Sequence, residues 1–101
     1  MAIKWSRRAR IDILDLKDYI GKDSPMNARR FTERMISVIE NLETFPTMGR
    51  PVPEADGRDD VRELIYQGYR IIYQTRANDL FIVTIIHGSR NLQGQRKKPW
   101  E

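Results

Sequence analysis

The sequence contains no cysteine and only one histidine, His87. The first absence excludes disulfide frameworks, thiolate nucleophiles and Cys-based zinc sites, and it fits a reducing compartment. The second excludes a multi-histidine metal site, so we expect no metal and no cofactor. No apolar run approaches the ~20 residues that span a bilayer, and the N-terminus lacks a signal-peptide core. We therefore expect a cytoplasmic protein without membrane contact, built as a single domain of residues 1–101.

Lysine is missing between Lys22 and Lys97, and the formal net charge of +4 is unevenly distributed. Residues 1–10 contain four cations and no acid, and the tail after residue 86 contains four cations against Glu101 alone. Clustered cations favour a polyanion or an acidic protein as partner. A solvated basic surface would give the same pattern, so charge alone leaves both interpretations open.

The first half of the sequence predicts a short strand and two helices. Residues 2–5 form a brief, mostly apolar stretch, Ser6 stands at a helix N-cap position, and Gly21 ends the first helix. Ser24 and Pro25 mark the start of a second helix. Both helices carry one apolar stripe at spacings of three and four. The first stripe is Ala9, Ile13, Leu16 and Ile20, and the second is Ala28, Phe31, Met35, Val38, Leu42 and Phe45.

The second half predicts three strands, at residues 61–66, 69–74 and 80–87, where β-branched and aromatic residues dominate. Tight turns at residues 66–69 and 76–79 join them into an antiparallel meander. We expect residues 46–60 to form a loop without regular structure, with Gly49-Arg50-Pro51 as a turn. The expected fold is α+β: an N-terminal strand and an antiparallel helix hairpin packed on a mainly antiparallel sheet.

Alternation along the strands places Arg62, Leu64 and Tyr66 on one face of the sheet, and Glu63 on the other. The last strand is apolar on both faces, but two helices cover only one face. We therefore expect a partner segment to cover the second face.

The order of these elements and motifs resembles the RelE/ParE superfamily of bacterial toxins, over nearly the whole chain. The resemblance rests on Met48-Gly49-Arg50-Pro51, Val61-Arg62-Glu63-Leu64, Tyr69-Arg70-Ile71-Ile72-Tyr73 and His87-Gly88-Ser89-Arg90, which look like the ParE or plasmid-stabilisation branch. It implies the toxin of a type II toxin–antitoxin pair, silenced by an antitoxin whose C-terminal segment wraps the toxin.

Two activities within that superfamily require different chemistry. ParE-like members are described as poisons of DNA gyrase that act by binding. RelE-like members cleave messenger RNA on the ribosome, which requires cations to hold the phosphate and a group that moves a proton. If this chain is such an endoribonuclease, the candidate catalytic residues are Arg62, Glu63, Arg70, His87 and Arg90.

RelE has several lysines near the sheet and a tyrosine close to its C-terminus. This sequence lacks those lysines and ends in Pro99-Trp100-Glu101. Gyrase binding without catalysis is therefore the first expectation, ribosome-dependent mRNA cleavage the second and a non-toxic co-repressor the third. The residues expected to bind the target or the antitoxin are Arg62, Arg70, His87, Arg90, Arg96, Lys97, Lys98 and Trp100.

Several of these residues have an alternative structural role. Arg70, in the middle of a strand, would stabilise the sheet if its guanidinium paired with Glu63 across the hairpin or stacked on Tyr66. His87 closes a strand, where a capping role is commoner than catalysis. An exposed Trp100 ring would be a contact point for a target, whereas a disordered tail would not.

Overall fold

The computed structural model describes residues 1–90 and 92–101 and has a five-stranded sheet in the order β1-β5-β4-β3-β2. β1 pairs parallel with β5, and the other neighbours are antiparallel. The strands are β1 (Ala2–Trp5), β2 (Arg50–Pro51), β3 (Val61–Tyr66), β4 (Tyr69–Arg76) and β5 (Asp79–His87). The α+β fold expected from the sequence is confirmed.

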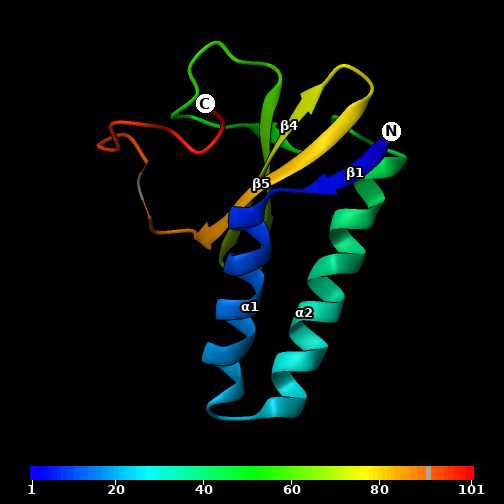
Figure 1. The fold of residues 1–101 in the computed structure, drawn as a ribbon, viewed down its shortest axis with the longest axis vertical. Helices are drawn as coiled ribbons and strands as arrows, with labels where there is room; N and C mark the ends of the chain where they lie inside the picture. Colours follow the sequence, from blue (N-terminus) through cyan, green and yellow to red (C-terminus); the bar gives the residue numbers. More distant parts are fainter. Residues whose placement is uncertain (91) are drawn as a thin grey trace.

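α1 (Arg7–Gly21) and α2 (Pro25–Glu40) run side by side as a hairpin, and their connecting turn projects beyond the strands (Figure 1). Both helices begin where the sequence predicts, because the Ser6 and Ser24 hydroxyls accept hydrogen bonds from the backbone amides of Ala9 and Asn27. A 3₁₀ turn, η1 (Asn41–Glu43), follows α2.

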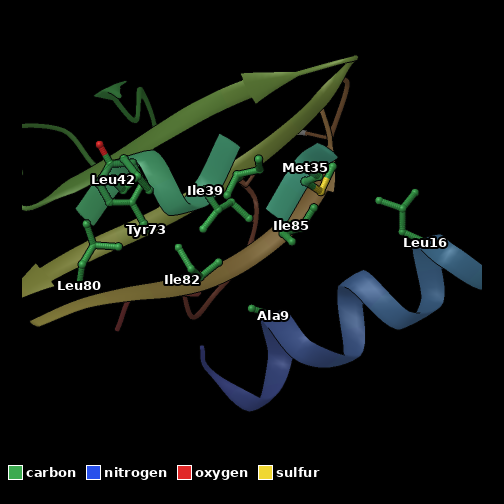
Figure 2. Packing of buried hydrophobic residues seen from close by; sticks show 10 residues of the cluster. Ala9, Leu16, Met35, Ile39, Leu42, Tyr73, Leu80, Ile82 and Ile85 are labelled. Atoms are coloured by element: carbon green, nitrogen blue, oxygen red, sulfur yellow. The ribbon is translucent and has the colours of Figure 1, made fainter. Parts of the chain in front are cut away.

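The apolar stripes of the helices pack on one face of the sheet. Figure 2 shows Ile39 and Leu42 above Tyr73 of β4, with Ile82 and Ile85 of β5 facing Ala9 of α1. This cluster is the main core of the protein. Phe45 was expected to extend the α2 stripe, but it is 62% exposed, because the helix ends before it and the 3₁₀ turn redirects the chain.

A β-bulge on β5 is fastened to α1. The register shifts between Ile72 and Tyr73 of β4, so that Val83 has no partner across the ladder. The Ser6 hydroxyl donates to the Val83 carbonyl over 2.7 Å, and the Asp12 carboxylate accepts from the Ile85 amide and the Thr84 hydroxyl. The polar groups freed by the bulge are therefore satisfied by the helix that lies across it.

The second face of the sheet is covered by the chain itself. A second cluster of buried apolar residues joins this face to the loop before β3 and to the C-terminal tail. Figure 1 shows the tail, in red, returning beside that loop, in green. The cluster contains Val52, Ala55, Val61, Ile72, Val83, Ile86, Leu92 and Trp100. The expectation of an open second face, covered by a partner, is therefore wrong.

The loop that links α2 to β3 is also more regular than expected. Gly49 to Pro51 was expected to form a turn, but Arg50 and Pro51 are β2, paired with Glu63 and Arg62. A proline is tolerated there because β2 is the sheet edge and its missing N–H interrupts no ladder.

Candidate functional site

The most unusual feature of the covered face is a cluster of four charged side chains: Arg50, Glu54, Glu63 and Arg70. Glu63 on β3 and Arg70 on β4 lie diagonally, since Glu63 pairs with Ile72 and Arg70 with Ile65. The Arg70 Nε donates to Glu63 Oε1 over 2.6 Å, and the Arg50 Nε donates to Glu63 Oε2 over 2.7 Å. Both oxygens of a fully buried carboxylate are therefore paired with arginines.

Glu54 closes the cluster from the loop between β2 and β3. Its carboxylate forms a two-pronged pair with Arg70, from Nη1 over 2.8 Å and from Nη2 over 2.7 Å. It also accepts from the backbone amide of Leu92, and Arg70 Nη1 donates to the carbonyl of Arg90. Glu54 and Arg70 thus hold the start of the tail against the sheet, and we call this group of four side chains the tail clasp.

The tail clasp lowers the pKa of one of its acids, Glu54. Hydrogen bonds from the Arg70 guanidinium, together with the Leu92 amide, hold the pKa of Glu54 at about 2, below its ordinary 4.5. The same carboxylate raises the pKa of Arg70 above its ordinary value. Two arginines balance two acids, so the clasp is neutral and does not by itself attract an anion.

The exposed part of the site lies beside the clasp, in a cleft of about 410 Å³ bordered by Arg50, Gly88, Ser89 and Arg90. Arg90 is exposed and also borders a second cleft of about 260 Å³ with His87 and Tyr69. The His87 ring lies edge-on to Tyr69, and its Nδ1 lies 2.7 Å from the Ser89 hydroxyl and accepts from the Ser89 amide. Of the five candidate catalytic residues, the structure leaves His87 and Arg90 facing solvent.

The other three candidates are engaged within the protein. Arg70 and Glu63 are sequestered in the clasp, where the side chain of Arg70 is 6% exposed. The pairing of Arg70 with Glu63 predicted for a structural arginine is confirmed. Arg62 lies on the helix side of β3 and donates to the Gly49 carbonyl over 2.9 Å, so it does not join His87 and Arg90.

The tail residues divide into buried and exposed ones. Trp100 is 4% exposed in the second cluster, so the expected exposed ring is not found. The Lys98 ammonium donates to the carbonyls of Gln93 and Gln95. Arg96 and Lys97 are exposed and remain available to a partner.

Sequence reasoning missed Glu54 and Arg50 as members of the clasp. Neither residue belongs to an element with a periodic pattern, and only the three-dimensional return of the loop brings them to β3 and β4. The available signal was that a buried arginine needs an acidic partner, and for Arg70 this reasoning identified Glu63 but not Glu54.

Within residues 1–90 and 92–101, no group of three or more histidines, acids and cysteines is placed to hold a metal ion. In the same residues, neither helix combines the length and apolar character needed to cross a bilayer. Every buried side-chain nitrogen or oxygen described in the structure has a hydrogen-bond partner.

Two helices on a five-stranded mixed sheet, with exposed cations at one edge, define a small α+β domain. The family model of the ParE toxin of the type II toxin–antitoxin system parDE matches residues 3–92, and the chain belongs to this family. It is 32% identical over 89 residues to Toxin RelE2 of Caulobacter vibrioides, covering 87% of this chain and 96% of the relative.

The fold agrees with a solved structure described as a chromosomal ParDE toxin–antitoxin system from P. aeruginosa. The two superpose with a TM-score of 0.72 at 20% sequence identity, over 86% of this chain and 95% of the other. At that identity, the likeness supports the fold.

Proposed function

We propose that this toxin inhibits growth by binding DNA gyrase, without catalysing cleavage of RNA. Membership of the ParE family supports gyrase, because ParE-like toxins are the branch described as gyrase poisons. The observation that carries the proposal is the commitment of Glu63 and Arg70 to the tail clasp.

In-line cleavage of RNA needs a group that accepts the 2′-hydroxyl proton and cations that hold the phosphate. Glu63 would have to break two ion pairs before it could accept a proton, and its carboxylate is inaccessible to a substrate. Arg70 uses Nε, Nη1 and Nη2 in internal hydrogen bonds. Breaking such a buried pair costs about 3–5 kcal/mol, which favours binding over catalysis.

The surface that we assign to the target consists of the exposed residues at the end of β5 and in the tail: His87, Arg90, Arg96 and Lys97. Because these side chains are cationic or titratable and point to solvent, they suit an acidic surface of a protein target.

A supercoiling assay with purified gyrase tests this function. The purified toxin is expected to block supercoiling of relaxed plasmid, while a cell-free translation reaction continues and its transcripts stay intact. Arrested translation with cut transcripts would instead establish mRNA cleavage, the second expectation. Unimpaired growth after induced expression would contradict both toxic activities and support the third expectation, a non-toxic co-repressor.

We also propose that the cognate antitoxin covers the outer groove of the helix hairpin with its C-terminal segment. This groove of about 290 Å³ is lined by Trp5, Arg10, Ile13, Leu14 and Ile36. Leu14 is 59% exposed and Ile36 37%, whereas the second face of the sheet is already covered by the tail. The groove therefore offers exposed apolar surface that a partner would be stabilised by covering.

Calorimetric titration of the toxin with the antitoxin segment tests the groove. Leu14→Glu is expected to weaken binding at least tenfold. Burying one charge in the groove costs more free energy than the ~1.4 kcal/mol that corresponds to a tenfold change in affinity. Asp18→Ala, an exposed change on the same helix, is the control. Equal affinities of the two variants would refute the assignment.

A further inference from the structure

A third cleft, also lined by cations, lies away from the tail clasp, between α2 and the tip of the β3–β4 hairpin. It has a volume of about 310 Å³. It is lined by Asn27, Arg30, Phe31 and Arg34 from α2, and by Tyr66 and Gln67 from the hairpin. None of the residues assigned above to gyrase or to the antitoxin lines it.

Arg30 and Arg34 are exposed and form no hydrogen bond or ion pair with any described residue. This distinguishes them from Arg29, which pairs with Glu33 on another side of the same helix. Like charges four residues apart repel each other on a helix surface. The helix therefore carries an unneutralised pair that a bound anion would stabilise.

Aromatic rings continue from this pair across the end of the sheet. The Phe31 ring lies 5.6 Å from Tyr66 and 5.8 Å from Tyr69, and Tyr69 lies 5.5 Å from the ring of His87. Phe31, Tyr66 and Tyr69 are half-buried, and Phe31 and Tyr66 line the cleft. Proteins that bind single-stranded nucleic acid combine cations, which contact the phosphates, with aromatic rings, on which the bases stack.

We propose that this cleft binds single-stranded nucleic acid, with Arg30 and Arg34 on the phosphates and Tyr66 against a base. An acidic peptide would also satisfy the arginines, but it would make no use of the rings beside them. The amide groups of Asn27 and Gln67 border the same cleft and offer donors and acceptors to a base edge. The proposal is independent of the gyrase assignment, since its ligand is bound without a protein target.

Fluorescence anisotropy of a labelled oligothymidylate, titrated with the purified toxin at several salt concentrations, tests the cationic half. The double variant Arg30→Gln/Arg34→Gln is expected to bind about tenfold more weakly, and its slope of log K against log salt should be shallower by about 1.4. Arg29→Gln removes a cation from another side of the same helix and is expected to bind almost as wild type. An equal loss for each cation removed in the two variants would mean that net charge alone drives binding and would overturn the proposal.

Substitutions of Tyr66 test the stacking of a base on its ring. Tyr66→Leu is expected to weaken oligothymidylate binding by about fivefold or more, because stacking on an aromatic ring contributes to each bound base. Tyr66→Phe keeps the ring and should restore binding, which separates stacking from a general loss of folding. A duplex of equal length should bind more weakly and should respond little to Tyr66→Leu. An absence of binding at low salt, or tighter binding of an oligoglutamate peptide through Arg30 and Arg34, would refute the proposal.

Discussion

Gly49 occupies a position where a side chain has no room. A Cβ at this position would lie 2.5 Å from the Tyr73 hydroxyl and 2.8 Å from the Glu63 carbonyl oxygen. The close approach lets the Gly49 amide donate to the Tyr73 hydroxyl over 3.0 Å, and that hydroxyl donates to the Pro46 carbonyl over 2.9 Å. Glycine at this position therefore fixes the start of β2 against the core.

Gly49→Ala is expected to lower the free energy of unfolding by about 1–3 kcal/mol, the usual cost of overpacking a filled site. Urea denaturation measures it. Gly94→Ala is the matched control, because a Cβ there would meet nothing within 4 Å. If both variants unfold at the same urea concentration, the close packing around Gly49 does not contribute to stability.

Glu54 makes the free energy of unfolding depend on pH. Its pKa in the folded protein is about 2 against an ordinary 4.5, chiefly through the Arg70 hydrogen bonds. A lowered carboxyl pKa stabilises the fold above pH 4.5, and this contribution is lost as the pH falls from about 4.5 towards 2. The shift corresponds to about 3 kcal/mol.

The unfolding free energies of wild type and Glu54→Gln should therefore differ by about 3 kcal/mol at pH 7, and the difference should shrink towards pH 2. Denaturation at a series of pH values measures this. Glu40→Gln, at an exposed position of α2, is the control. A difference that is constant with pH would show that Glu54 does not titrate through the clasp.

At the scale of elements, local signals predicted most of the fold. The helix caps at Ser6 and Ser24 and the strands after Val61 were predicted correctly, because capping and alternation act within a few residues. β2 was not predicted, since two residues carry no period and their strand exists only through pairing with β3. The packing of the tail was missed for a similar reason, because Leu92 and Trp100 are isolated apolar residues in a polar segment.

Trp100 makes the tail part of the fold rather than a free arm. Trp100→Ala is expected to cost about 3–5 kcal/mol if the tail unfolds with the rest of the protein, because a buried indole is lost from the second cluster. Thermal denaturation and tryptic cleavage after Arg96 measure the stability and the release of the tail. Lys97→Ala, at an exposed tail position, is the control. Equal melting and cleavage in the two variants would mean that the indole does not anchor the tail.

For the whole molecule, the structure changes which cations are available to a partner. The sequence gives 18 lysines and arginines against 14 acids, but the clasp removes Arg70 from the surface and hydrogen bonds to backbone carbonyls occupy Arg62 and Lys98. The cations that remain near the end of β5 are Arg90 and the exposed pair in the tail, Arg96 and Lys97. This availability could not be predicted from charge, because burial and ion pairing depend on contacts distant in the sequence.

Catalysis and binding predict different effects of substitutions in the intact toxin. Deleting residues 96–101 would remove Trp100 and destabilise the second cluster, so substitutions of exposed residues give the cleaner test. Arg96→Gln/Lys97→Gln should raise the toxin concentration that blocks supercoiling by about tenfold, because cations at the edge of an interface steer association. His87→Ala should raise this concentration by less than the tail variant does, since His87 contributes only contacts and a protein that acts by binding needs no proton transfer there. Arg7→Gln/Arg8→Gln, at two exposed positions of α1, is the charge-matched control. If His87→Ala abolishes killing while the tail variant stays toxic, the protein acts by catalysis and the proposed function is wrong.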